Sequence, residues 1–233
     1  MNPPYFLSSG LQAAIVDLDG TLIDTLGDFV EALNRSLAEL RLPEVAPSDV
    51  AKLVGKGSEH LIRSVLAQVG AGSDRYEDAW AAYQRHYLVI NGRHAAVYPG
   101  APEALRAMQA RGWKLACVTN KPTAFARTLL EAKGLLQAFD RVFGGDAFER
   151  KKPDPLPLVR ACEALGTEPG QTLVIGDSSN DAQAARAAGC PVWLVTFGYN
   201  HGEPVLAVPA DGHFSSWAGL CSALQAPSRA GRP

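Results

Sequence analysis

Cysteine and methionine are scarce in this chain, which has four and two of them among its 233 residues. The cysteines, at positions 117, 162, 190 and 221, show none of the paired spacings that indicate a metal site. Cys117 falls inside a predicted strand and Cys190 at the start of another, which indicates buried thiols in a reducing compartment. We therefore expect a cytoplasmic protein.

An excess of charge of one sign is also absent. The formal net charge of −2 provides no broad basic field, so we expect neither a nucleic-acid nor a membrane partner. No stretch approaches the roughly 20 apolar residues of a membrane-spanning helix, and residues 1–10 lack the basic start and apolar run of a signal peptide. We expect residues 1–10 and 225–233 to be loose tails.

Two aspartates stand directly after an apolar stretch near the N-terminus. Residues 13–16 are typical of a central parallel strand covered on both faces, and Asp17-Leu18-Asp19-Gly20-Thr21 follows. Alternate residues of an extended chain face one side, so Asp17 and Asp19 can share a pocket beyond the end of the strand. Adjacent carboxylates repel unless a cation or a shared proton relieves them, which indicates a metal site. Gly20 and Thr21 add a tight turn and a hydroxyl for an anion; the alternative is an ordinary turn with two solvated acids.

Two further apolar stretches end in polar residues in the same way. Residues 113–118 are followed by Thr119-Asn120-Lys121-Pro122, and residues 172–175 by a segment with Asp177 and Asp181. Between them lies a cationic, proline-containing loop with Lys152. Together these segments supply a nucleophile, a proton shuttle, a metal anchor and a phosphate clamp, which is the set needed for phosphoryl transfer to an aspartate.

These segments resemble the motifs of the haloacid-dehalogenase-like phosphatase superfamily, and within it the bacterial phosphoglycolate phosphatases. The first motif corresponds to residues 17–21 and the second to Thr119, in the Thr-Asn-Lys-Pro form typical of that branch. Lys152-Pro153 corresponds to the third motif, and Gly176-Asp177 with Asp181 to the fourth. All four occur in the family's order, and the resemblance covers roughly residues 12–222.

The resemblance implies a role for each matching residue. Asp17 would attack phosphorus and form an aspartyl-phosphate, and Asp19 would protonate the leaving group and then deprotonate water. Thr119 and Lys152 would hold the phosphoryl oxygens. Magnesium would be held by the Asp17 carboxylate, the Asp19 backbone carbonyl and Asp177, with waters completing its coordination.

Other polar residues of the motifs are given supporting roles. Asn120 would contact the phosphoryl group, and Asp181 would orient Lys152 or a metal-bound water without ligating the metal. Plainer interpretations remain open: Thr119 as the end of a strand, one lysine of the pair 151–152 as a surface residue, and Asp181 as a first-turn acid favoured by its helix dipole.

The order of the segments predicts an α/β fold with a doubly wound parallel sheet, a Rossmann-like core and a small inserted α-helical cap domain. We expect the core at 11–23 plus 95–224 and the cap at 24–94. Helical spacing of apolar residues covers 29–40 and 61–69, and a third helix at 74–90 carries an aromatic stripe with Trp80, Tyr83 and Tyr87, interpreted as core.

The cap is expected to recognise the part of the substrate that is not phosphate. Gly55-Lys56-Gly57 resembles the cap loop of the phosphoglycolate phosphatases, and its glycines let backbone amides approach a small anion. A turn with a solvated lysine is the equal alternative. His201 is interpreted as a loop-ordering residue, because Asp19 already fills the acid–base role.

The expected function is hydrolysis of a small phosphorylated metabolite with magnesium as cofactor, most specifically 2-phosphoglycolate to glycolate and phosphate. A sugar phosphomutase, or a phosphatase for another small sugar phosphate, stays open because the motifs bind only phosphate and metal. Asp19 and Asp177 argue against a dehalogenase, and Asp19 against a phosphonate hydrolase. A phosphoacceptor signalling module would be about half this length, and a binding protein would not need every motif intact. A monomer and a homodimer are both compatible with the sequence.

Overall fold

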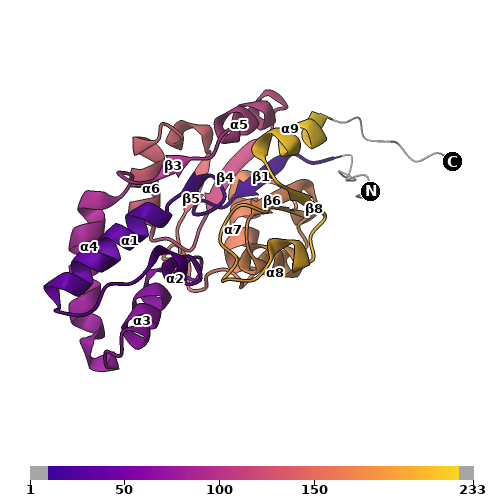
Figure 1. The fold of residues 1–233 in the computed structure, drawn as a ribbon. Coiled ribbons are helices and arrows are strands. Elements are labelled where there is room, and N and C mark those ends of the chain that lie inside the picture. The colour runs from indigo at the N-terminus through magenta and orange to yellow at the C-terminus, as the bar shows by residue number, and fades with distance from the viewer. Residues whose placement is uncertain (1–9, 226–233) are drawn as a thin grey trace.

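A six-stranded sheet forms the centre of the molecule (Figure 1) in this computed structural model, which describes residues 10–225. The strand order is β5-β4-β1-β6-β7-β8, and every neighbouring pair is parallel. The strands are β1 (Ala13–Val16), β4 (Lys114–Val118), β5 (Arg141–Phe143), β6 (Thr172–Gly176), β7 (Val192–Val195) and β8 (Gly212–Phe214). The tails predicted at 1–10 and 225–233 lie, apart from residues 10 and 225, outside the described residues.

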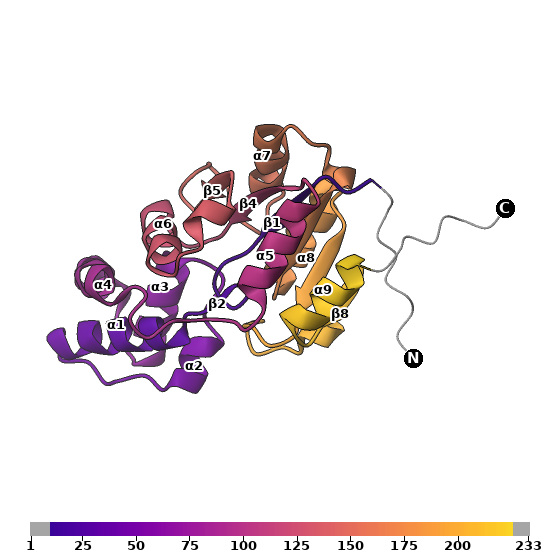
Figure 2. The same cartoon turned by 90° about the horizontal axis from the view of Figure 1, so that it is seen from above.

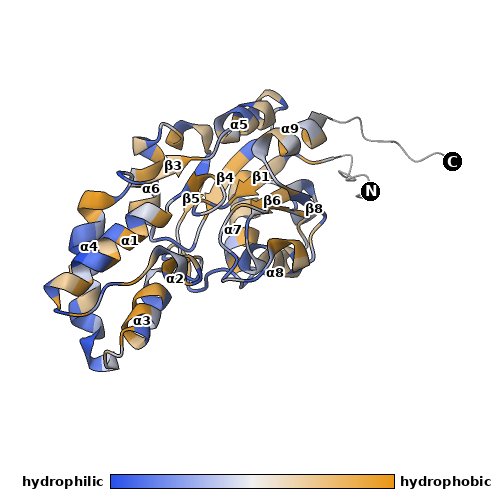
Figure 3. Cartoon of the chain, viewed as in Figure 1, coloured by the Kyte–Doolittle hydropathy of each residue, from blue (hydrophilic) through white to orange (hydrophobic). Residues whose placement is uncertain are grey.

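Helices cover both faces of this sheet. Ala14 and Val16 of β1 pack with α5, α6 and α9, whereas Ala13 and Ile15 pack with α7 and α8. Burial on both sides explains why β1 is apolar throughout, and Figure 3 shows hydrophobic residues along the central strands. The predicted doubly wound α/β fold is confirmed. These helices are α5 (Ala101–Ala110), α6 (Thr123–Ala132), α7 (Leu156–Leu165), α8 (Ser179–Ala188) and α9 (Trp217–Gln225).

Four helices lie beside the sheet, on the side of its β5 edge (Figures 1 and 2). They are α1 (Leu26–Glu39), α2 (Pro47–Ala51), α3 (Ser58–Gln68) and α4 (Tyr76–Ile90). Their apolar faces meet in a hydrophobic cluster of their own, which Phe125 of α6 joins from the core. Tyr83 and Tyr87 are buried there with stacked rings, so the aromatic stripe is core, as predicted. We use the name cap segment for residues 24–94; its domain bounds stay a prediction.

The two crossings between the cap segment and the core are joined to each other. Strands β2 (Ile23–Asp24) and β3 (Ala96–Val97) form a short antiparallel pair. Close by, the buried carboxylate of Asp28 accepts hydrogen bonds from the backbone N–H groups of Gly92 (2.6 Å) and His94 (2.7 Å). The segment that leaves the core and the segment that returns to it are therefore held together by hydrogen bonds.

Short 3₁₀ turns complete the described chain, at Ser73–Arg75, Leu136–Ala138, Pro169–Gln171 and Val205–Ala207. Cys117 and Cys190 are buried, as predicted, and Cys162 is buried as well. Among residues 10–225, none of the helices has the length and apolar content needed to cross a membrane.

Candidate active site

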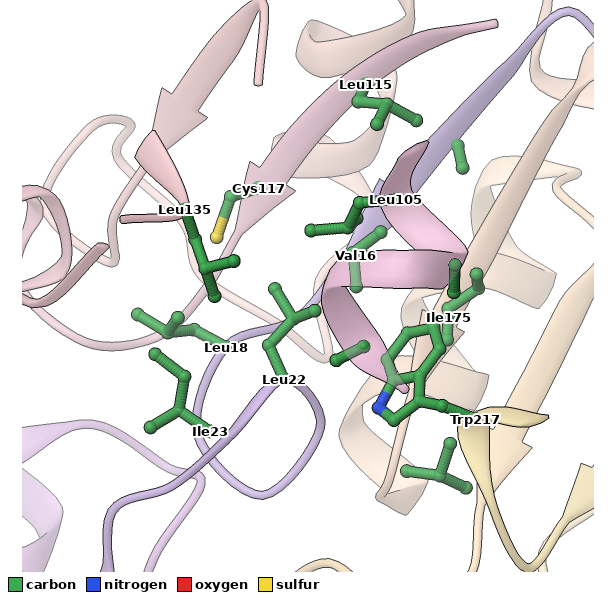
Figure 4. Close-up of a cluster of buried hydrophobic side chains, with 14 of the residues drawn as sticks. Val16, Leu18, Leu22, Ile23, Leu105, Leu115, Cys117, Leu135, Ile175 and Trp217 are labelled. Atoms are coloured by element: carbon green, nitrogen blue, oxygen red, sulfur yellow. The ribbon is translucent and has the colours of Figure 1, made fainter. Parts of the chain in front are cut away.

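The loop after β1 presents two carboxylates because the residue between them points into the core. Leu18 is fully buried with Val16 and Leu22 (Figure 4), so Asp17 and Asp19 face away from that cluster. The Leu18 carbonyl accepts hydrogen bonds from the N–H groups of Leu22 and Ile23, which closes a tight turn. This geometry fixes both carboxylates at the carboxyl end of the central strand.

Lys152 reaches the same place from the loop before α7. Its Nζ donates to Asp17 Oδ1 (2.9 Å), Asp181 Oδ1 (2.7 Å) and the Val118 carbonyl (2.7 Å). Burial works against the ammonium charge, but the two carboxylates raise the pKa of Lys152 above its usual value. Lys152 is therefore a buried, charged donor beside Asp17, and the expected contact between Lys152 and Asp181 is present.

The remaining aspartates follow β6 and are held by backbone and hydroxyl donors. Asp177 Oδ1 accepts from the Thr21 hydroxyl (3.0 Å), and its other oxygen from the backbone N–H of Tyr199. Asp181 Oδ2 accepts from the Ser178 hydroxyl (2.7 Å) in a capping box that begins α8. The sequence predicts that the Thr21 hydroxyl binds an anion. In the structure this hydroxyl instead donates to Asp177, and Thr21 is not among the residues that line the cavity next to Asp17, which is described below.

The acidic cluster fits a divalent cation. Asp17, Asp177 and Asp181 each offer a carboxylate oxygen within 4.8 Å of the others, and carboxylate oxygens are the ligands that magnesium prefers. Four ionised carboxylates (with Asp19) against two ammonium groups, Lys152 and Lys121, leave two negative charges. Burial, aided by Asp181, raises the pKa of Asp17 to about 7 against the opposing charge of Lys152, so in the metal-free protein protons relieve the repulsion.

An enclosed cavity of about 30 Å³ lies over these groups. Its floor comes from the core and includes Asp17, Asp19, Thr119 and Lys152, while its roof comes from the cap segment. The roof is formed by Phe29, Val54, Gly55, Gly57, Ser58 and Leu61. The structure therefore brings the four predicted catalytic residues together in one cavity that the cap segment covers.

Asn120 lines this cavity, but its side-chain N–H groups are already engaged. Nδ2 donates to the Gly55 carbonyl (2.9 Å) and to the Lys152 carbonyl (2.8 Å). Asn180 of α8 donates to the same Gly55 carbonyl (3.1 Å). A contact between the Asn120 amide and a phosphoryl group stays a prediction, whereas the two asparagines tie the cap loop to the core.

The backbone of the cap loop (residues 55–57) and the side chain of its lysine face two different cavities. Gly55 and Gly57, at φ values of +105° and +90°, line the enclosed cavity. The exposed Lys56 side chain instead lines an open outer cavity of about 930 Å³, together with His60 and Lys151. Lys151 is exposed, as expected for one lysine of the pair, with its Nζ 3.1 Å from where a Cβ on Gly57 would lie.

His201 lies against the cap loop. Its Cε1 is 3.1 Å from the position that a Cβ on Gly55 would take, and its ring nitrogens have no hydrogen-bond partner in the described part of the chain. Burial, aided by the charge of Lys56, lowers the pKa of His201, so a neutral ring packs on this glycine. The contact is compatible with the predicted loop-ordering role, which stays a prediction.

Two residues of the site went unassigned in the sequence: Lys121 stands in the second motif segment, whereas Tyr199 lies in the loop after β7. Lys121 Nζ is 2.8 Å from Asp19 Oδ1 in a buried ion pair. Tyr199 accepts hydrogen bonds from the N–H groups of Thr25 and Leu26 through its phenol oxygen, which also donates to Asp24, while its own N–H binds Asp177. A lysine inside a motif loop, two residues after Thr119, was the available signal for Lys121.

Known proteins resemble this chain in sequence and in fold. It matches the haloacid dehalogenase-like hydrolases over residues 11–189. A phosphoglycolate phosphatase of Thiobacillus denitrificans is 41% identical over 204 residues, covering 86% of this chain and 90% of that protein. One from Cupriavidus necator is 44% identical over 219 residues, covering 93% and 94%. The crystal structure of a predicted phosphoglycolate phosphatase from Haemophilus somnus superposes with a TM-score of 0.88 at 31% identity, covering 94% of this chain and 100% of that chain.

These matches confirm the resemblance seen in the motifs, since the family match spans the helical insertion as well as all four motif segments. The chain therefore belongs to the haloacid dehalogenase-like hydrolase family.

Proposed function

We propose that this protein is a magnesium-dependent phosphomonoester hydrolase that acts through an aspartyl-phosphate on Asp17, and that its substrate is 2-phosphoglycolate. The observation that carries the proposal is the enclosed cavity with Asp17, Asp19, Thr119 and Lys152 on one wall. A carboxylate nucleophile, a second carboxylate and a buried ammonium within one closed space are the parts that phosphoryl transfer to an aspartate needs.

In the first half of the reaction, a carboxylate oxygen of Asp17 attacks phosphorus. The bond between phosphorus and the substrate's alkoxide oxygen breaks, and the carboxylic acid form of Asp19 gives its proton to that oxygen. Lys152, 2.9 Å from Asp17 Oδ1, neutralises charge beside the new bond, and Thr119 offers its hydroxyl to a phosphoryl oxygen. The products of this step are glycolate and phosphorylated Asp17.

In the second half, water attacks the phosphorylated Asp17. The Asp19 carboxylate takes a proton from the water, the bond between phosphorus and the Asp17 oxygen breaks, and phosphate leaves. Asp19 ends the cycle protonated and Asp17 ionised, which are the forms that the first half requires; in the substrate-free protein Asp19 is instead ionised and paired with Lys121, so it takes up a proton when substrate binds. One residue serves both halves because the proton moves in opposite directions.

Asp17, the Asp19 carbonyl and Asp177 would hold magnesium, with Asp181 fixing Lys152 beside them. When bound, magnesium neutralises charge on the phosphoryl oxygens and on the attacking carboxylate. Few protein ligands and several retained waters are normal for this ion.

The choice of 2-phosphoglycolate rests on the relatives. The cavity of about 30 Å³ has room for about one or two water molecules, so the roof must move to admit any phosphomonoester, and the volume does not choose among them. The relatives at 41% and 44% identity carry the name phosphoglycolate phosphatase. The substrate carboxylate would meet the N-terminus of α3 at Gly57 and Ser58, which line the cavity and whose backbone N–H groups belong to the start of the helix.

A magnesium-dependent activity screen tests this proposal. We expect 2-phosphoglycolate to give the highest kcat/KM among small phosphomonoesters, hexose monophosphates and hexose bisphosphates. Asp17→Asn should abolish turnover. When the wild type is mixed with ³²P-labelled substrate and quenched in acid, we expect radioactive protein to be recovered, and Asp17→Asn should give none. Asp49→Asn, which removes an exposed carboxylate on α2, serves as the control.

Each outcome of these experiments tests a different part of the proposed function. Retention of more than about one per cent of activity by Asp17→Asn contradicts the covalent route. A higher kcat/KM on a hexose phosphate contradicts the substrate, and isomerisation of that sugar phosphate without phosphate release would identify a phosphomutase.

A further inference from the structure

The buried ion pair between Lys121 and Asp19 has no part in the mechanism above. Lys121 follows Asn120 in the loop after β4, and its Nζ lies 2.8 Å from Asp19 Oδ1. Only 1% of the Lys121 side chain and 9% of the Asp19 side chain are exposed. Lys121 also lines the enclosed cavity, so it lies beside the reacting groups.

The backbone of Lys121 is held in place on the core side. Its carbonyl accepts a hydrogen bond from Gly145 N–H (2.9 Å), and its own N–H donates to the Thr119 hydroxyl (3.3 Å). A Cβ on Gly144 would lie 2.6 Å from the Lys121 carbonyl, so only glycine allows this approach. The side chain therefore extends from a fixed point.

The ammonium of Lys121 is covered by aromatic rings of the cap segment. It lies 4.3 Å from the ring centroid of Phe29 on α1 and 4.9 Å from that of Tyr87 on α4. These two rings stack on each other at 5.6 Å. A buried ammonium needs such compensation, because it has lost its water.

Lys121 thus has one partner in the core and two in the cap segment. Asp19 supplies the negative charge, and the rings of Phe29 and Tyr87 replace water around the rest of the ammonium. If the cap segment moved away, water would replace the rings, and the charge-assisted bond to Asp19 would weaken in the higher dielectric. The orientation of Asp19 therefore depends on the cap segment through one side chain.

We propose that Lys121 is the positioning residue through which the closed cap segment orients Asp19. The inference rests on the proposed function, since it assigns Asp19 the acid–base role. Misplacing a reacting group by about 1 Å costs up to about 100-fold in rate, so a residue with this role has a measurable effect without touching phosphorus.

A double-mutant cycle tests the proposal. Lys121→Met should lower kcat/KM on 2-phosphoglycolate about 10- to 100-fold, with the loss in kcat. The loss should be far smaller on p-nitrophenyl phosphate, because nitrophenolate leaves without a proton. In an Asp19→Asn background, Lys121→Met should cause little further loss, because the residue that it positions is gone.

A second variant tests the cap side of the contact. Phe29→Leu keeps an apolar residue but removes the ring. As a single substitution it should lower kcat on 2-phosphoglycolate, whereas in a protein that already carries Lys121→Met it should cause little further loss. Lys114→Met is the matched control, because Lys114 lies at the opposite end of β4 and donates to the Leu165 carbonyl. It should leave kcat/KM unchanged.

The outcomes separate this inference from the proposed function. A Lys121→Met variant that loses activity equally on both substrates, or that adds its full effect to Asp19→Asn, would act on the substrate or on folding, and the positioning role would be overturned. A wild-type protein without phosphomonoesterase activity would overturn the proposed function and the positioning role together.

Discussion

A methyl group cannot be added at Gly198 without moving Asp177. A Cβ built there overlaps Asp177 Oδ2 and the Gly20 carbonyl, so the loop after β7 packs directly on the proposed metal ligand. At the scale of single residues, the position of Asp177 is thus set by the absence of a side chain as well as by the hydroxyl of Thr21.

Gly198→Ala should therefore raise the magnesium concentration needed for half-maximal activity. Disturbing a residue that orients a metal ligand typically costs 10- to 100-fold in metal affinity, and we expect a loss of about that size. A magnesium titration of activity measures it. Gly170→Ala is the control, because a Cβ there has open space, and it should leave the titration unchanged. An unchanged magnesium titration for Gly198→Ala would show that Asp177 is not a ligand of the metal.

The raised carboxyl pKa values predict how magnesium affects stability. Burial raises the pKa of Asp17 from 3.8 to about 7, and burial with Asp181 raises that of Asp177 well above its usual value. The folded state holds these protons more tightly than the unfolded state, so the stabilisation from Asp17 is full below a pH of about 3.8 and is lost as the pH rises through about 7. Magnesium bound at this site would take the place of the protons.

The increase in melting temperature caused by magnesium should consequently be larger at a pH of about 8 than at about 5. Differential scanning calorimetry with sodium chloride at matched ionic strength checks this. Asp177→Asn should remove most of the difference. A magnesium effect of equal size at both values would mean that the cation binds elsewhere.

At the scale of elements, Asp28 joins the start of α1 to the chain that returns from α4. Its carboxylate is fully buried and accepts from Gly92 and His94 N–H groups. Asp28→Ala would leave two buried donors without acceptors, each at a cost of about 1–3 kcal/mol.

We expect Asp28→Ala to lower the unfolding free energy by a few kcal/mol and to raise KM for the substrate, because the roof of the cavity would lose its fixed attachment. Chemical denaturation and steady-state kinetics provide the measurement, and Asp49→Ala on the exposed face of α2 is the control. Normal stability in Asp28→Ala would show that water replaces the carboxylate.

How far the sequence predicts these elements depends on whether the signal is local. Apolar spacing predicts α1, α3 and α4, whereas the five-residue α2 is too short to show a period. The edge rule for parallel sheets places Asp17, Asp19 and Asp177 together. The partners of Lys121, and the outer cavity that Lys56 lines, are set by how the cap segment sits on the core; neither follows from local pattern.

At the scale of the whole molecule, the cap segment and the core meet at the Gly55 carbonyl. Asn120 donates to it from the loop after β4 (2.9 Å) and Asn180 from the first turn of α8 (3.1 Å). These bonds close the cavity over Asp17, and each contributes about 0.5–1.5 kcal/mol to the closed arrangement.

Asn180→Ala should shift the balance toward an open arrangement by about 2- to 10-fold, with a similar rise in KM and faster proteolysis of the segments on either side of the cap. Steady-state kinetics and timed limited digestion measure both effects. Gln137→Ala, which removes an exposed amide in a 3₁₀ turn, is the control. Unchanged digestion with raised KM would instead indicate a direct contact between Asn180 and substrate.

The group that accepts the hydrogen bonds from Asn120 and Asn180 is a main-chain oxygen, which every amino acid possesses. Side chains of the cap loop, Lys56 among them, can therefore be exchanged without deleting the group that Asn120 and Asn180 hold. Closure depends on the core, while the Lys56 side chain, which faces the outer cavity, stays free to vary. Substitutions at position 56 should therefore leave the closed arrangement intact, which makes this position a point where new side chains can be attached beside the site.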